Sequence, residues 1–210
     1  MGELGGDPAE RTAERRRPLE PDPGNAGGGK NMNENKSLEY KASSSTKIIA
    51  EIVSFVALAT ALSYIKVFSL PQGGSVTAGS MVPILWLALR RGPKIGLFAA
   101  AVYGLVQLAV EPFIVHPAQV LLDYPIAFGA LGLAGLFRNR PFIGVNVGIW
   151  SRFLAHFLSG IIFFANYAPE GMHPIVYSAI YNGGYILPEL AISIYIVYLL
   201  QESKLLKMFL

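Results

Sequence analysis

Residues 151–174 read SRFLAHFLSGIIFFANYAPEGMHP, and the first half of this stretch is apolar enough to form a helix within a membrane. Two polar side chains interrupt the apolar run. Arg152 and His156 are four residues apart, so they share one face of a helix. Ionisable groups are costly at membrane depth and usually face a bundle interior or a cavity. The stretch therefore predicts a transmembrane helix with one face turned towards protein or a pocket.

The composition predicts an integral membrane domain that follows a polar tail. Hydrophobic residues make up 52% of the 210-residue chain and charged residues 15%, whereas soluble proteins carry about 25% charged residues. The charges are concentrated in residues 1–50. We expect residues 1–45 to form a disordered cytoplasmic tail, because they have too few large apolar side chains to bury. Residues 46–210 are expected to form the membrane domain.

The tail contains a basic run, AERRRP, at residues 13–18. Such a run can attract anionic lipid or nucleic acid, but a solvated stretch of a cytoplasmic tail is the simpler interpretation. We therefore expect no nucleic-acid partner.

The chain has no cysteine, which excludes disulfides, thiol catalysis and Cys-ligated metals.

Six apolar segments predict an all-α bundle of six transmembrane helices. They cover residues 47–68, 79–89, 93–110, 117–137, 142–164 and 174–200. The second segment is shorter than the roughly 20 residues that a span requires. We therefore expect the preceding loop, PQGGSVTAG (residues 71–79), to dip to membrane depth and cover an outward-facing pocket; an ordinary outer loop is the alternative. Gly73, Gly74 and Gly79 suit close backbone approach and positive φ angles.

The charges of the loops predict the orientation of the bundle. RRGPK (residues 90–94), RNR (residues 138–140) and the lysines near both chain ends belong on one side, while the three remaining loops contain no Lys or Arg. By the positive-inside rule, both termini are cytoplasmic. Lys66 lies near the outer end of the first segment, where its long side chain can reach the interface.

Three polar residues on different predicted helices lie at a similar depth in the outer half of the bundle. Asp123, His156 and Asn182 are each roughly 9–12 Å below the outer boundary, at 1.5 Å per residue. Each could be a satisfied packing residue, but their common depth favours a ligand pocket. The nearby aromatic residues are either pocket walls or an interfacial belt, and the belt is the favoured interpretation for Tyr167. They are Phe163, Phe164, Tyr167, Tyr177 and Tyr181. A planar, nitrogen-rich aromatic ligand with a positive charge suits this set.

The sequence contains no motif that predicts catalysis. GxSxG, HExxH and paired-carboxylate motifs are absent, and His116 and His173 lie in outer loops, far in depth from His156. We therefore expect no enzymatic activity, no metal and no cofactor.

We expect Arg152 to bind backbone carbonyls or a carboxylate. A free-standing proton-coupled carrier that uses Asp123 and His156 is an alternative, although no internal repeat supports it.

Two stretches resemble the ThiT family. They are HPAQVLLDYPIAFGALGLAG (residues 116–135) and RFLAHFLSGIIFFANYAPEGMHPIVYSAIYNGGYILPE (residues 152–189), and the resemblance extends over residues 49–200. Members are thiamine-specific substrate-binding subunits (S-components) of energy-coupling factor (ECF) transporters. The resemblance implies a multi-pass protein of the cell membrane that captures thiamine from outside for ATP-driven uptake. Its implied partners are a transmembrane coupling (T) subunit and two ABC-type ATPase subunits.

The resemblance also implies which residues bind the ligand. His156, Tyr177 and Asn182 match binding positions of the family as they stand. The other implied binding residues depart from or flank the pattern: Asp123 where the family has glutamate, Tyr124 directly after it, Phe164 where tryptophan is typical and Phe113 where tyrosine is common. A shorter carboxylate and a weaker cation–π face follow from these departures. An S-component for a related vitamin or a hydroxymethylpyrimidine-like precursor is therefore the alternative.

The first apolar segment contains a pair of small residues spaced for helix contact. In FVALATALSY (residues 55–64), Ala57 and Ala61 are four residues apart. Small residues at this spacing let another helix approach closely within a membrane. The resemblance implies that this face docks the coupling subunit.

Overall fold

The computed structural model describes residues 26–203, without the side chains of residues 26–36 and 39–44. The chain divides into two units, Met1–Lys47 and Ile48–Leu210. In the first unit, helix α2 (Ala26–Ser63) has already begun, so residues 26–45 differ from the disorder expected for them. No proline occurs between Pro23 and Pro71 to stop a helix, and extending a helix is easier than starting one. The rest of the expected tail, residues 1–25, lies outside the described residues.

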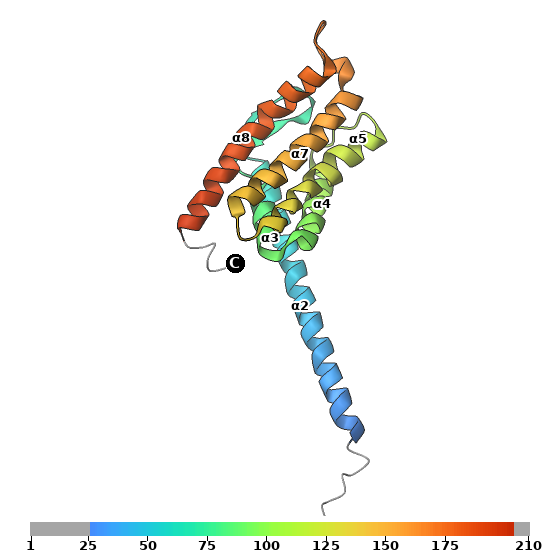
Figure 1. Cartoon of the computed structure of the whole chain (residues 1–210). Coiled ribbons are helices and arrows are strands. Elements are labelled where there is room, and N and C mark those ends of the chain that lie inside the picture. Colours follow the sequence, from blue (N-terminus) through green and yellow to red (C-terminus); the bar gives the residue numbers. More distant parts are fainter. Residues whose placement is uncertain (1–25, 204–210) are drawn as a thin grey trace, which may run out of the picture. The chain divides into compact units, whose positions relative to one another are not determined.

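The second unit is mostly helical (Figure 1). Its elements after α2 are β1 (Lys66–Ser69), η1 (Pro71–Gly73), β2 (Ser75–Thr77), α3 (Val82–Arg91), α4 (Pro93–Val110), α5 (Pro117–Leu121), η2 (Leu122–Ile126), α6 (Ala127–Gly129), η3 (Ala130–Phe137), α7 (Pro141–Phe163), η4 (Ala165–Tyr167) and α8 (Pro174–Glu202).

Five helical stretches between residues 26 and 203 are long and apolar enough to cross a membrane. They are Ser45–Ser63, Pro93–Val110, Pro117–Phe137, Pro141–Phe163 and Pro174–Glu202. The short second segment predicted from the sequence is α3, which has 10 residues. The chain is therefore a multi-pass membrane protein, with α3 as a short helical segment beside the five longer ones.

A small β-hairpin replaces the end of the first predicted helix, so the all-α prediction is wrong at this point. Helix α2 ends at Ser63, and strand β1 pairs with β2 in an antiparallel sheet. The φ angles are +90° at Gly73 and +88° at Gly79, values that glycine adopts readily, and this confirms the expectation for these two residues. Gly74 instead serves close approach, because a Cβ atom there would lie 2.8 Å from Cδ1 of Tyr185.

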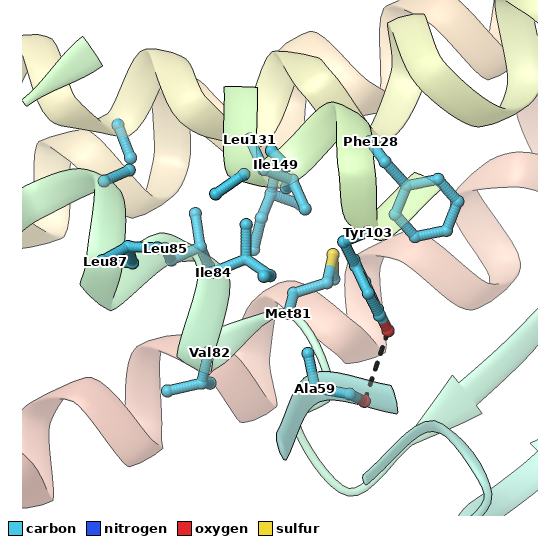
Figure 2. Packing of buried hydrophobic residues seen from close by; sticks show 14 of the residues in the cluster. Ala59, Met81, Val82, Ile84, Leu85, Leu87, Tyr103, Phe128, Leu131 and Ile149 are labelled. Atoms are coloured by element: carbon cyan, nitrogen blue, oxygen red, sulfur yellow. Dashed lines mark hydrogen bonds between the residues drawn. The ribbon is translucent and has the colours of Figure 1, made fainter. Parts of the chain in front are cut away.

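Buried apolar side chains around α3 form the core of the second unit (Figure 2). Ile84, Leu85 and Leu87 of α3 are completely buried. Tyr103 of α4 is buried as well, and its hydroxyl donates a hydrogen bond to the carbonyl of Ala59 at 3.4 Å, drawn as a dashed line in Figure 2. The core thus holds α3 against α4, η3 and α7, which explains how so short a helix is stable within the bundle.

One buried carboxylate connects the hairpin to α8. The side chain of Glu189 is 2% exposed. Its Oε1 atom accepts hydrogen bonds from the backbone N–H and the hydroxyl of Thr77. Its Oε2 atom has no hydrogen-bond partner among the described residues. The end of β2 is therefore fastened to the middle of α8.

Removal of residues 1–44 should leave the folding of the membrane domain unchanged. The buried apolar core runs from Ile52 to Val197, entirely within the second unit. The check is thermal unfolding of the purified deletion variant beside the full chain in the same detergent. A much lower unfolding temperature for the deletion variant would show that the tail contributes to the folded domain.

Candidate functional site

A cavity of about 130 Å³ lies between the hairpin, the loop at residues 111–116, η2, α7 and α8. All seven residues predicted to bind a ligand line it. They are Phe113, Asp123, Tyr124, His156, Phe164, Tyr177 and Asn182. The structure thus brings these side chains together, while their role in binding stays a prediction. Ala57 and Ala61 lie elsewhere, exposed on α2.

Asp123 lies on an irregular turn of helix. Residues Leu122–Ile126 form a π-helical turn with Pro125 inside it. Proline has no N–H to donate and interrupts regular helical hydrogen bonding, and π-helical turns occur frequently at functional sites. On the same turn, Tyr124 accepts a hydrogen bond from the Phe113 N–H at 2.7 Å and donates one to the Glu111 carbonyl at 2.9 Å. Tyr124 therefore fixes the loop that carries Phe113.

The carboxylate of Asp123 pairs with the imidazole of His156. Asp123 Oδ1 lies 3.0 Å from His156 Nδ1, and their side chains are 13% and 11% exposed. The second carboxylate oxygen, Oδ2, accepts a hydrogen bond from Gln119 Nε2 at 2.7 Å. Both oxygens thus have a protein partner and keep lone pairs for a ligand.

Gln119 was not predicted from the sequence. Its side chain is 1% exposed and lines the cavity. It accepts a hydrogen bond from the Val115 N–H at 3.0 Å and donates one to the Phe113 carbonyl at 3.1 Å. Its spacing of four residues from Asp123, which places both on one helix face, is the signal that could have identified it.

The partners of Arg152 differ from those expected. Its Nε donates a hydrogen bond to His156 Nε2 at 3.3 Å, and its guanidinium lies 4.1 Å from the ring centroid of Phe128. It also lies 2.7 Å from the sulfur of Met81. Within residues 26–203 it forms no salt bridge and donates no hydrogen bond to a backbone carbonyl, so the expectation of a carbonyl or carboxylate partner is wrong. The imidazole one turn away and the Phe128 ring take their place.

Asn182 is held by hydrogen bonds at both ends of its amide. The nitrogen donates to the Ser178 carbonyl at 2.9 Å and to the His156 carbonyl at 3.3 Å. The oxygen accepts from the Tyr185 hydroxyl at 3.0 Å. Tyr185 packs edge-on against His156. Asn182 therefore ties α8 to the part of α7 that carries the imidazole.

The aromatic residues divide into pocket walls and outer residues. Phe113 and Phe164 stack with their centroids 5.9 Å apart and their planes at 23°. Tyr177 and Tyr181 also line the cavity. Phe163, in contrast, stacks on His116 outside the cavity lining. Tyr167 lies beside Phe164 but does not line the cavity. The sequence favoured an outer position for Tyr167, but it could not separate Phe163 from the pocket walls.

The hairpin covers one side of the cavity. Residues Gln72 to Ser75 line it. The Gly74 N–H donates to the Tyr181 hydroxyl at 3.0 Å, and that hydroxyl donates to the Pro71 carbonyl. At the start of the hairpin, Lys66 forms an ion pair with Glu111. The loop preceding α3 is therefore a wall of the pocket, as the shortness of the second apolar segment predicted.

Comparison with known proteins gives concordant results. The family model "Thiamine transporter protein (Thia_YuaJ)" matches residues 49–209. A protein named thiamine transporter ThiT from Bacillus subtilis (strain 168) is 34% identical over 190 residues, which cover 80% of this chain and 93% of the relative. Another of that name, from Lacticaseibacillus paracasei, is 32% identical over 174 residues, covering 71% of this chain and 84% of the relative.

A solved structure of ThiT from Listeria monocytogenes has the same fold. Its TM-score with this chain is 0.70 at 24% sequence identity. The match covers 76% of this chain and 96% of that one.

Proposed function

Since this chain belongs to the thiamine transporter family Thia_YuaJ, we propose that it is the thiamine-binding subunit (S-component) of an ECF-type importer in the plasma membrane. It takes part in transport and has no catalytic activity of its own. It captures thiamine from outside in the cavity lined by Asp123 and His156. Partner subunits then supply the ATP hydrolysis that drives uptake.

The observation that carries the proposal is the chemical match between the cavity and thiamine. The aminopyrimidine ring presents N–H donors, and the carboxylate of Asp123 offers acceptors in the cavity wall. The thiazolium ring is a flat cation, and aromatic ring faces attract cations. Phe113, Phe164 and Tyr177 supply such faces within the same cavity. Because Phe113 and Phe164 already contact each other, we expect the cation to stack on a free face of this pair.

The proposed docking face is on α2. Ala57 and Ala61 are both exposed and lie one helical turn apart. Lipid would accept larger apolar side chains equally well, whereas small ones let another helix pack closely. We assign this face to the transmembrane coupling subunit, which in turn contacts the two ATPase subunits.

Calorimetric titration of the purified protein tests the ligand. Thiamine, hydroxymethylpyrimidine and riboflavin are titrated separately, and thermal shift is measured in parallel. Thiamine at 100 times its Kd should stabilise the fold by about 2.7 kcal/mol. Failure of thiamine to bind would refute the proposal. Tighter binding of hydroxymethylpyrimidine would identify a precursor transporter, and uptake driven by a proton gradient in the lone subunit would identify a free-standing carrier.

A further inference from the structure

Four side chains of the cavity wall form a continuous hydrogen-bonded chain. Arg152 Nε lies 3.3 Å from His156 Nε2, and His156 Nδ1 lies 3.0 Å from Asp123 Oδ1. Asp123 Oδ2 lies 2.7 Å from Gln119 Nε2. All four residues line the cavity. The direction of each hydrogen bond in this chain follows from the chemistry at its two ends.

At one end, the guanidinium of Arg152 has N–H donors and no acceptor. The His156 Nε2 atom that faces it must therefore offer a lone pair. A neutral imidazole with a lone pair on Nε2 carries its proton on Nδ1. That N–H then donates to Asp123 Oδ1.

At the other end, the backbone fixes the amide of Gln119. The Val115 N–H donates to Oε1, so the amide nitrogen is the atom that faces the Phe113 carbonyl and Asp123 Oδ2. Asp123 is therefore an acceptor at both oxygens. His156 thus makes Oδ1 an acceptor and Gln119 makes Oδ2 an acceptor, and the two assignments are independent of each other.

We propose that Arg152 is a positioning residue that holds His156 with its proton on Nδ1 and so keeps Asp123 a pure acceptor towards the ligand. The site then selects a ligand edge that donates a hydrogen bond and rejects one that accepts. The identity of that ligand rests on the proposed function, whereas the state of His156 is a property of this chain alone. The other groups that face the imidazole are the rings of Phe128 from α6 and Tyr185 from α8.

Nitrogen NMR of the purified protein tests the state of His156 directly. The chain has only three histidines, so a sample labelled with ¹⁵N in histidine gives a readable spectrum. His116→Gln and His173→Gln variants assign the His156 signals by elimination. We expect a protonated Nδ1 and an unprotonated Nε2 in the wild-type protein without ligand. A proton on Nε2, alone or together with one on Nδ1, would overturn the proposal without any change at Arg152 or His156.

Ligand selectivity tests the expected preference for a ligand edge that donates a hydrogen bond. Oxythiamine replaces the amino group of thiamine with an oxo group, which turns a donor into an acceptor. The wild-type protein should bind it about 10- to 150-fold more weakly than thiamine, the range for a hydrogen bond to a charged group. Arg152→Met should lower the ratio of the Kd for oxythiamine to the Kd for thiamine. It should also add a His156 population with a proton on Nε2. Arg152→Lys, which keeps a donor, should preserve both properties.

A matched control is Arg138→Met. Arg138 donates to the carbonyls of Leu89 and Arg90, and it does not line the cavity, so its loss should not change the ratio. If Arg152 had a purely structural role, Arg152→Met would weaken the binding of thiamine and oxythiamine by the same factor. That result would overturn the proposal. If neither compound binds the wild-type protein but His156 is in the expected state, the proposed ligand is wrong and the role of Arg152 stands.

Discussion

Asp123→Asn is expected to weaken thiamine binding by about 10- to 150-fold, because a hydrogen bond to a charged group contributes about 1.5–3 kcal/mol. The carboxylate accepts hydrogen bonds from Gln119 and His156. An amide at this position replaces one acceptor with an N–H donor, which must face one of these donors or the amino group of the ligand. Calorimetric titration of the purified variant measures the effect.

Two further variants make the result specific. Asp123→Glu keeps both acceptors and restores the residue typical of the resembling family, so it should retain binding. Glu170→Gln makes the same carboxylate-to-amide change on an exposed loop outside the cavity and should leave the Kd unchanged. If Asp123→Asn binds thiamine as tightly as the wild-type protein, the carboxylate does not contact the ligand.

Replacing Ala57 and Ala61 together with Trp should abolish ATP-dependent uptake while thiamine binding by the isolated subunit stays unchanged. Both residues are exposed on α2, and neither lines the cavity. Two indole rings on this face prevent the close helix approach that small residues allow. The measurements are thiamine uptake into vesicles that contain the reconstituted complex and calorimetry on the purified variant.

A double variant on another helix controls for the bulk of the indole rings. Leu105 and Ala109 are exposed on α4 and are also four residues apart, so Leu105→Trp with Ala109→Trp adds the same rings where no docking is proposed. This control should retain uptake. Uptake that survives the change at Ala57 and Ala61 would mean that this face meets only lipid. Loss of binding in the isolated variant would mean that the face packs inside the bundle.

The sequence by itself determined the membrane class and the apolar segments, and it predicted a similar depth for three polar residues. Hydropathy and residue spacing are local properties, and a span needs about 20 apolar residues whatever surrounds it. The short α3 segment and the meeting of Asp123, His156 and Asn182 in one cavity could be predicted for this reason. The resemblance to a known family added Phe113 and Tyr124.

Only the tertiary structure decided several of the contacts between segments. The end of the first apolar segment forms β1, because it pairs with β2 beyond a turn, and strand pairing depends on a partner segment. Arg152 meets the Phe128 ring of α6, and Phe163 stacks on His116 outside the cavity lining. Such contacts depend on how each helix is rotated about its axis against its neighbours, and spacing within one segment carries no information about that rotation.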